Sequence, residues 1–234
     1  MISTALPYGL SSREEAPHYF DWMAALFAEA ISGDVLDHGA GTGALTARLL
    51  LRARRVVALE PDGVLHGLLC ERFQAEPRVE VLRGTIETFL ERSGPSTLDA
   101  IFSSNVLEHI QDDVDCLELL RTALKKGGAL AVYVPARQEL FGSLDESVGH
   151  VRRYSRSELT RKLSLAGFRV EWAQYRNLAG VLPWLFAGRV LRSRELSSGK
   201  LRLFDRFVFP MSQLLEARLP MPYGLNLAVL ARRK

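Results

Sequence analysis

Three glycines at alternate positions, between an apolar run and a helical pattern, constrain the fold of this chain more than any other feature. The stretch 35–46 begins as an apolar run that ends in Asp37, and Gly39, Gly41 and Gly43 follow. A buried parallel strand delivers the chain to the edge of a sheet, glycines let the backbone turn tightly beside a ligand, and the next helix presents its N-terminus. The sequence therefore predicts a nucleotide-type pocket at this turn.

The turn alone leaves the class of nucleotide open. Gly39, Gly41 and Ala44 satisfy the dinucleotide fingerprint Gly-x-Gly-x-x-Ala, and Glu60 lies about 20 residues further on, where such folds hold a ribose. A turn that binds no ligand is a further alternative. Three alternating glycines argue against it, because they weaken the start of a helix without any gain in packing.

Residues 37–43, taken as Asp-x-Gly-x-Gly-x-Gly, resemble the first motif of the class I S-adenosylmethionine-dependent methyltransferases. In that family the acid lies at the end of the first strand. The resemblance implies that S-adenosylmethionine is the cofactor and that the motif contributes cofactor-binding residues. These are Asp37, Gly39, Ala40, Gly41 and Gly43.

Composition limits the class of protein. The chain has 234 residues with 47% hydrophobic content, enough for a full α/β core without a disulfide or a structural metal. Cys70 and Cys116 lack metal-ligand spacing, which is typical of structural thiols in a reducing compartment, and we expect no metal site. No signal peptide or transmembrane run is present, so we expect a cytoplasmic protein. The formal charge of +3 gives little support to nucleic-acid binding.

An acid follows the second expected strand, 55–59. Glu60 can accept hydrogen bonds from both hydroxyls of a ribose, and Pro61 ends the strand at that point. The alternative is an exposed acid that caps the next helix. The resemblance assigns ribose binding to Glu60, with Pro61 beside it as a second cofactor-binding candidate.

The segment after the third expected strand, 79–82, departs from the family pattern. Many members of the family carry an acid where Thr85 stands, and that acid accepts a hydrogen bond from the adenine amino group. Here the Thr85 hydroxyl can accept instead, or backbone groups can hold the adenine while Ile86 packs on its face. We therefore expect Thr85 and Ile86 beside the adenine.

The stretch 98–110 also resembles the methyltransferases. Its strand begins with an acid and ends in small polar residues, and Asn-Val-Leu-Glu-His follows. The resemblance places Ser103 and Asn105 under the methionine portion of the cofactor and turns the next loop toward the acceptor. His109 is a candidate general base, because imidazole titrates near physiological pH. The alternative is a structural role for His109 in the loop.

An irregular segment rich in ionisable groups, 138–154, follows the fifth expected strand. It ends in His150, Arg152, Arg153 and Tyr154. This His-x-Arg-Arg-Tyr pattern resembles a branch of the family associated with sugar, lipid and secondary-metabolite modification. His150 is accordingly a candidate base or acceptor-orienting residue, and the other three are candidates for acceptor binding. The alternative is that Ser155 and Glu158 form a capping box, so that the segment only starts a helix.

Two further segments flank the expected core. Residues 1–12 are expected to form a loose arm or lid, and 13–32 a helix with one apolar face that covers the sheet. The resemblance brings an aromatic of this helix, Tyr19, toward the methionine end of the cofactor. Residues 176–223 mix apolar and basic side chains and are expected to form a helical insert. This insert can be a packed subdomain, a lid over the acceptor, a dimer contact or an amphipathic surface for anionic membrane.

The alternation of strands and helices predicts a doubly wound α/β sheet. Together with the resemblance it implies a Rossmann-like sheet of seven strands with the last strand antiparallel. We expect an arm and covering helix at 1–32, a cofactor-binding core at 33–175, the insert at 176–223 and the final strand at 224–234.

The resemblance implies methyl transfer from S-adenosylmethionine, which leaves S-adenosylhomocysteine. We favour oxygen as the acceptor atom because of His109 and His150, while nitrogen and carbon stay open. The lack of an Asn-Pro-Pro-Tyr pattern argues against DNA adenine methylation. A small-molecule or lipid-linked acceptor and a monomer or homodimer are expected. The alternatives are a nicotinamide-dependent oxidoreductase, for which no Tyr-x-x-x-Lys pair is present, and a cofactor-binding protein that transfers no methyl group.

Overall fold

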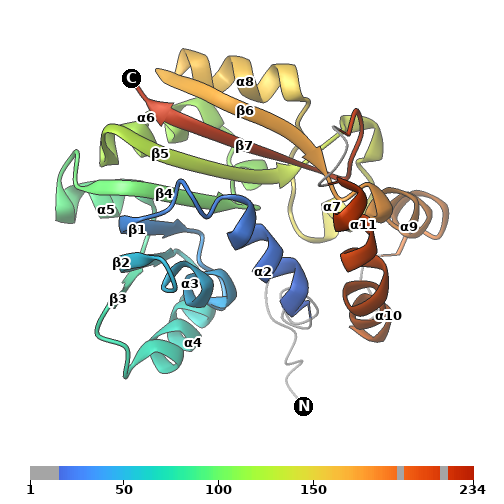
Figure 1. Ribbon diagram of the computed structural model, residues 1–234, viewed down its shortest axis with the longest axis horizontal. Helices are drawn as coiled ribbons and strands as arrows, with labels where there is room; N and C mark the ends of the chain where they lie inside the picture. Colours follow the sequence, from blue (N-terminus) through green and yellow to red (C-terminus); the bar gives the residue numbers. More distant parts are fainter. Residues whose placement is uncertain (1–15, 194–197, 217–220) are drawn as a thin grey trace.

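One seven-stranded sheet organises the computed structural model, which describes residues 16–193, 198–216 and 221–234. The strands are β1 (Gly33–His38), β2 (Ala53–Glu60), β3 (Val79–Arg83), β4 (Leu98–Ser104), β5 (Leu124–Pro135), β6 (Phe168–Arg176) and β7 (Asn226–Arg233). They lie in the order β3-β2-β1-β4-β5-β7-β6, with β7 antiparallel to both neighbours (Figure 1). The expected Rossmann-like sheet with an antiparallel last strand is confirmed.

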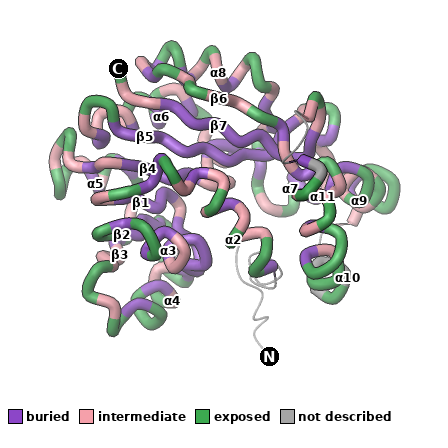
Figure 2. Tube along the Cα trace, viewed as in Figure 1, coloured by how far each residue is buried: buried purple, intermediate pink, exposed green. Residues whose placement is uncertain are grey.

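Helices cover both faces of this sheet. One face carries α2 (Pro17–Leu26), α3 (Ala44–Leu49) and α4 (Gly63–Phe73), and the other carries α5 (Ile86–Ser93), α6 (Asp113–Ala123) and α8 (Arg156–Leu165). The central strands β1, β4 and β5 are therefore buried along most of their length (Figure 2). Burial on both faces explains why these strands appear in the sequence as continuous apolar runs.

The N-terminal helix is shorter than the sequence predicts. α2 ends at Leu26 rather than at residue 32, because Phe27 leaves helical geometry. Its ring centroid lies 5.1 Å from those of both Phe102 and Trp172, so the side chain is drawn into the core. The expected arm and the first residues of the expected helix, 1–15, lie outside the described part of the chain.

The end of α6 is set by burial rather than by a helix cap. Residues 125–128 have the lysines and glycines typical of a helix C-terminus, but they belong to β5. The helix ends at Ala123, and the fully buried Leu124 already pairs with Leu98 of β4. Burial of the Leu124 side chain therefore leads the chain directly from helix to strand.

The described part of the expected insert is helical and packs against α2. Its elements are η4 (Leu178–Gly180), α9 (Val181–Leu185), η5 (Phe186–Val190), α10 (Ser198–Leu203), η6 (Phe204–Val208) and α11 (Phe209–Glu216). The buried Asp205 accepts hydrogen bonds from the backbone N–H groups of His18 (3.2 Å) and Tyr19 (3.0 Å). A carboxylate of the insert therefore caps the first turn of α2, where orphan N–H groups need an acceptor.

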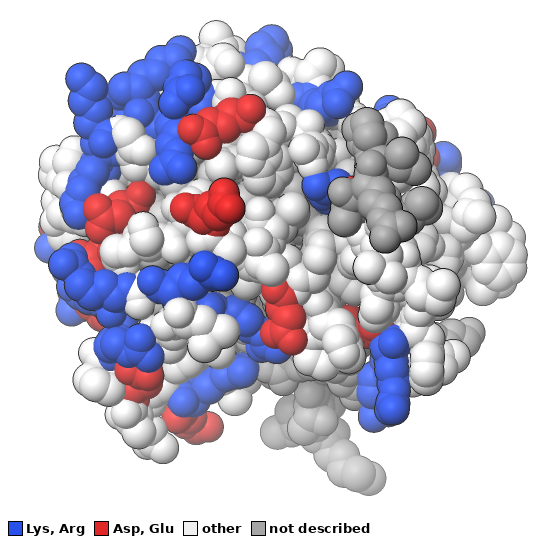
Figure 3. Space-filling model, in the orientation of Figure 1, with Lys and Arg blue, Asp and Glu red and all other residues white. Residues whose placement is uncertain are grey.

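Large apolar side chains are exposed along the insert. They are Leu178, Leu182, Phe186, Val190, Leu191, Leu203, Phe207, Val208, Met211 and Leu214. Figure 3 shows few charges in this region, on the right of the view, whereas Lys and Arg gather on the left, near α8 and the C-terminus. None of the described helices combines the length and the apolar character needed to cross a membrane.

Candidate active site

A cavity of about 490 Å³ lies at the C-terminal edge of the parallel strands. It is bordered by the segments after β1, β2, β3 and β4 and by the loop after α7 (Ser143–Ser147). β1 and β4 are neighbours in the sheet, although β2 and β3 lie between them in sequence. Open α/β sheets bind their ligands at such a reversal of strand order, and the volume is typical of a small-molecule site.

Glu60 is held in place at the end of β2. Its Oε2 accepts a hydrogen bond from the backbone N–H of Gly41 at 2.8 Å, and its Oε1 accepts one from Asp62 at 3.0 Å. Burial raises the pKa of Glu60, and these two hydrogen bonds act in the opposite direction. A carboxylate has about four lone-pair positions, so a fixed Glu60 can still accept from two hydroxyls of a ligand.

The glycine turn lies against β2 and takes up its own N–H groups. The N–H groups of Gly39 and Ala40 donate to the carbonyl of Leu59 at 2.9 and 3.0 Å. Gly39 has φ +74°, and a Cβ there would lie 2.4 Å from Cγ2 of Val106. Only glycine fits at this point, because both the backbone angle and the approach of Val106 exclude a side chain. These two N–H groups are therefore not offered to a ligand. The turn contributes to the cavity by bringing its backbone close to the space that a ligand can occupy.

Most of the cofactor-binding candidates line the cavity. They are Gly39, Gly41, Glu60, Pro61, Thr85, Ile86 and Asn105. The remaining candidates lie outside the lining, and their role as cofactor contacts stays a prediction. They are Tyr19, Asp37, Ala40, Gly43 and Ser103. The ring of Tyr19 packs in an aromatic group instead, with its centroid 5.9 Å from that of Tyr133 and 5.4 Å from that of Phe209.

Asp37 and His38 project from opposite faces of β1. Asp37 accepts a hydrogen bond from the Thr46 hydroxyl of α3 at 2.6 Å, and burial raises its pKa to about 7. His38 lines the cavity with Nδ1 3.0 Å from Ser103 Oγ, and burial lowers its pKa to about 4. His38 is therefore neutral at pH 7. Sequence reasoning did not single it out, although the period of two in a strand places it opposite Asp37.

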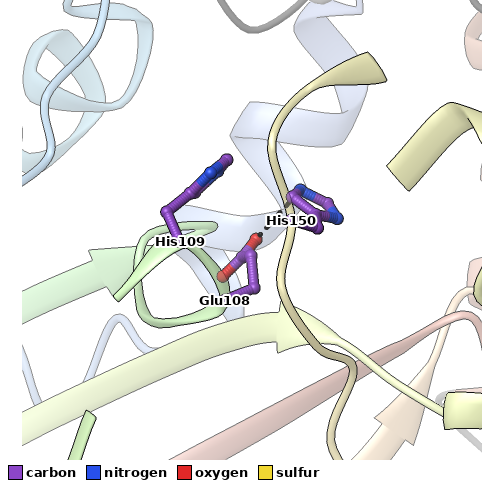
Figure 4. A group of neighbouring side chains, drawn as sticks. All are labelled: Glu108, His109 and His150. Atoms are coloured by element: carbon purple, nitrogen blue, oxygen red, sulfur yellow. Dashed lines mark ion pairs between the residues drawn. The ribbon is translucent and has the colours of Figure 1, made fainter. Parts of the chain in front are cut away.

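Two histidines and a buried glutamate meet at the other end of the cavity (Figure 4). Glu108 and His109 belong to the short helix η2 (Leu107–His109) after β4, and His150 follows α7. The ring centroids of the two histidines are 4.8 Å apart, and Nε2 of His150 lies 3.6 Å from Oε1 of Glu108. His109 and His150 were candidates from the sequence; Glu108 was not.

Asp145 of α7 orients His150. Its Oδ1 lies 2.8 Å from Nδ1 of His150 and accepts a hydrogen bond from Nε of Arg153 at 2.9 Å. Burial acts to raise the pKa of Asp145, but the hydrogen bond to His150 and the charge of Arg153 outweigh it and lower the pKa. The result is an ionised carboxylate that fixes one ring nitrogen of His150. Sequence reasoning missed Asp145, because the segment around it showed no helical period.

Arg153 is a buried part of the framework. Its guanidinium pairs with Asp145, donates to the carbonyl of Ala136 at 3.0 Å and lies 4.8 Å from the ring centroid of Trp184 in α9. Arg153 is 2% exposed, and it does not line the cavity. Its assignment as an acceptor contact stays a prediction, while the observed contacts connect the histidine loop to the insert.

Arg152 and Tyr154 also contact protein groups outside the cavity lining. Both approach Asp113 at the start of α6, with distances to Oδ2 of 3.0 Å from the Arg152 guanidinium and 2.7 Å from the Tyr154 hydroxyl. The side chain of Ser155 accepts a hydrogen bond from the backbone N–H of Glu158 at 3.2 Å, so the segment does start a helix. Acceptor binding by Arg152 and Tyr154 likewise stays a prediction.

Comparison with known proteins gives a match to a family model over part of the core. The model describes a methyltransferase domain and matches residues 36–132. An uncharacterized methyltransferase of Bacillus mycoides is 30% identical over 120 residues, which are 50% of this chain and 54% of that protein. One of Bacillus cereus has the same identity and coverage. The chain spans about half the length of these curated relatives.

Solved structures of similar fold cover nearly the whole chain. The YcgJ protein of Bacillus subtilis has a TM-score of 0.63 at 15% identity, covering 93% of this chain and 99% of that one. The 1,6-didemethyltoxoflavin N1-methyltransferase of Burkholderia thailandensis has a TM-score of 0.59 at 20% identity, covering 95% and 80%. That structure contains bound 1,6-didemethyltoxoflavin and S-adenosylhomocysteine. The [4+2]-cyclase SpnF has a TM-score of 0.64 at 18% identity, covering 93% and 80%. At these identities the likeness is one of fold.

Proposed function

We propose that this chain, whose residues 36–132 match a model of a methyltransferase domain, is a class I S-adenosylmethionine-dependent methyltransferase that transfers a methyl group to an acceptor oxygen. The observation that carries the proposal is a single cavity with two chemically different ends. Glu60 stands at one end, and His109 and His150 stand at the other. A ligand with a ribose at the first end can therefore present its reactive group toward an acceptor held at the second.

The residues at the Glu60 end fit S-adenosylmethionine. The two backbone N–H groups that fix the carboxylate leave lone pairs for the two ribose hydroxyls. Thr85 and Ile86 line the adjoining wall, where an adenine can pack against the Ile86 side chain. Asn105, also in the lining, has φ +53°, a strained backbone conformation of the kind found at functional sites. We assign it to the methionine portion of the cofactor.

The residues at the histidine end fit a hydroxyl acceptor. S-adenosylmethionine supplies a methyl group that its sulfonium already activates, so the chain must align the acceptor, exclude water and remove a proton. His150 lies in the lining with Nδ1 fixed by Asp145, which directs Nε2 toward Glu108 and His109. We assign to this histidine cluster the task of holding the hydroxyl while it loses its proton.

The exposed apolar side chains of the insert favour a lipid-linked or otherwise apolar acceptor. None of the described residues of the insert belongs to the cavity lining. The insert is connected to the acceptor end, however, because Ser143 of α7 donates to the carbonyl of Gly188 at 2.8 Å. An apolar surface fixed beside the acceptor loop can hold the apolar part of a substrate whose hydroxyl enters the cavity.

Thermal unfolding with added nucleotides tests the cofactor class first. We expect S-adenosylhomocysteine to raise the unfolding temperature of the full chain and NAD(H) and NADP(H) to leave it unchanged. A ligand at about 100 times its dissociation constant stabilises by about 2.7 kcal/mol. The matched control is Glu91→Ala, an exposed acid on α5, which should respond like the unaltered protein. Stabilisation by the nicotinamides alone would replace the methyltransferase proposal with an oxidoreductase.

Transfer itself is tested with a panel of hydroxylated acceptors and isotopically labelled S-adenosylmethionine. We expect label in an ether product and release of S-adenosylhomocysteine. Label in an amine or carbon product would overturn the choice of oxygen. Cofactor binding without transfer to any member of a panel that also includes amine and carbon acceptors would favour a protein that uses the cofactor without consuming it.

A further inference from the structure

We propose that Glu108, His109 and His150 bind a divalent transition-metal ion at the acceptor end of the cavity. One ligand atom from each of these residues lies within 4.8 Å of the others. Glu108 is fully buried and His150 is 6% exposed, while His109 lies at the cavity wall. Figure 4 shows the three side chains grouped where η2 meets the loop after α7.

The ring orientations support metal binding. A histidine that binds a metal usually donates its other ring N–H to a carboxylate or a carbonyl, which fixes the tautomer. Nδ1 of His150 lies 2.8 Å from Oδ1 of Asp145, and Nδ1 of His109 lies 3.2 Å from the carbonyl oxygen of Gly149. Both partners are acceptors, so both rings carry the proton on Nδ1. The Nε2 atoms then carry the lone pairs that a metal needs.

The donor set indicates which ions fit. Two imidazoles and one carboxylate suit Zn²⁺, Co²⁺, Mn²⁺ or Fe²⁺, whereas Mg²⁺ and Ca²⁺ prefer all-oxygen surroundings. Three protein ligands leave at least one position open, as in catalytic metal sites. Zinc bonds of about 2.1 Å place neighbouring ligand atoms about 3.4 Å apart. The present 4.8 Å therefore requires a closure of about 1.4 Å, which the His109 side chain at the cavity wall can provide.

Further acids favour a cation at this place. Asp112 and Asp115, at the start of α6, line the same cavity. Their charge attracts a cation to the cavity and holds it near the cluster. Glu108 also receives structural support, because its carbonyl accepts a hydrogen bond from the backbone N–H of Val151 at 2.9 Å. This bond keeps the glutamate and the histidine loop together.

The role of the ion in catalysis rests on the proposed methyl transfer; its binding does not. An acceptor hydroxyl at the open position would have its pKa lowered and release its proton to water. That oxygen would form a C–O bond with the methyl group as the C–S bond of the sulfonium broke, and the thioether would leave with the electron pair. Acceptors with two adjacent oxygens, such as a catechol or a vicinal diol, fit best because both oxygens can reach one ion.

Metal binding is tested without cofactor or acceptor. Chelator-treated full-length protein is titrated with CoCl₂ and with ZnCl₂ by calorimetry, and Co²⁺ binding is also followed by its visible absorption. We expect one equivalent of each ion. Glu108→Gln and His109→Ala should weaken binding at least tenfold. His66→Ala is the matched control and should leave metal binding unchanged. Nε2 of His66 lies 3.7 Å from Sγ of Cys70, so this control also removes a histidine that lies beside a second group able to bind metals.

The outcomes separate this inference from the proposed function. Failure to bind either ion, or equal binding by wild type and His109→Ala, overturns the metal site. His109→Ala is the safer variant, because Glu108 is fully buried and its substitution can unfold the chain. Metal binding without any response to S-adenosylhomocysteine would instead overturn the methyltransferase proposal and leave the metal site standing. A response to S-adenosylhomocysteine without metal binding would do the reverse.

Discussion

The two ends of the cavity are built from different parts of the chain. Around Glu60 the partners are near in sequence, since the N–H donors belong to residues 19 and 2 positions away. At the histidine end, His109 contacts the carbonyl of Gly149, 40 positions away. The first end follows from the register of neighbouring strands. The second exists only where the loops after β4 and β5 meet.

This difference separates binding from chemistry. The Glu60 end is part of the sheet edge, so a change there should affect cofactor affinity and fold stability. The histidine end depends on Asp145, which holds His150 and Arg153 together. A change there should affect transfer and leave cofactor affinity intact. Each prediction below tests whether the two ends are as independent as this construction indicates.

His150→Ala should produce the largest effect. It removes the ring that Asp145 orients, and groups that handle a proton in the transition state contribute about 10²- to 10⁴-fold to a rate. We expect turnover to fall by at least about 10²-fold with the affinity for S-adenosylhomocysteine unchanged. Single-turnover transfer and calorimetric binding measure the two quantities. His66→Ala, on α4, is the matched control, and a normal rate in His150→Ala would remove the histidine end from catalysis.

The same difference decides what the sequence could predict. Glu60 could be identified because a strand-ending acid followed by proline is a local pattern, and the strand order then places it at the cavity. His109 and His150 could be chosen singly from their chemistry. Their meeting could not be predicted, because it depends on the packing of two loops. Glu108 escaped notice because a single turn of helix has no period that tells which way its side chain points.

Asp37 and His38 should each change the free energy of unfolding by about 3 to 4 kcal/mol as the pH changes. The pKa of Asp37 rises from 3.8 to about 7 on folding, so its contribution to stability is full below pH 3.8 and is lost as pH rises to 7. The pKa of His38 falls from 6.5 to about 4, so its contribution is present above pH 6.5 and is lost as pH falls to 4. Between pH 4 and 6.5 the two contributions to the free energy of unfolding change with pH in opposite directions, so they cancel in the unaltered protein.

Two variants separate the pH dependence of the two groups. As the pH rises from 4 to 7, the unfolding free energy of Asp37→Asn should increase by about 4 kcal/mol relative to that of wild type. As the pH falls from 6.5 to 4, the unfolding free energy of His38→Gln should increase by about 3 kcal/mol relative to that of wild type. Urea unfolding at pH 4.0, 5.5 and 7.0 measures both. Curves parallel to wild type would mean that water reaches these side chains. That result would make the Glu60 end less rigid than the comparison requires.

Glu60→Ala should weaken binding of S-adenosylhomocysteine by about 1–3 kcal/mol, since it removes the acceptor for ligand hydroxyls. It also leaves the N–H groups of Gly41 and Asp62 without this acceptor, so some loss of stability is expected. Calorimetry at a temperature where both proteins are folded measures the affinity. Glu91→Ala should match wild type. Unchanged affinity in Glu60→Ala would place the ribose elsewhere.

Substitution of exposed apolar residues on the insert should have the smallest effect on the fold. Leu182→Ser and Phe186→Ser change side chains that are 74% and 56% exposed, so unfolding free energy should stay within about 0.5 kcal/mol of wild type. If the insert serves the acceptor end, transfer to a lipid-linked acceptor should fall several-fold while transfer to a short soluble analogue stays normal. Leu51→Ser is the matched control. Leu51 follows α3, is 82% exposed, and belongs to neither the insert nor the acceptor loop. An equal loss with both acceptors would instead couple the insert to the cavity through Trp184 and Arg153. The acceptor end would then extend into the insert, and the contrast with the locally built Glu60 end would become larger.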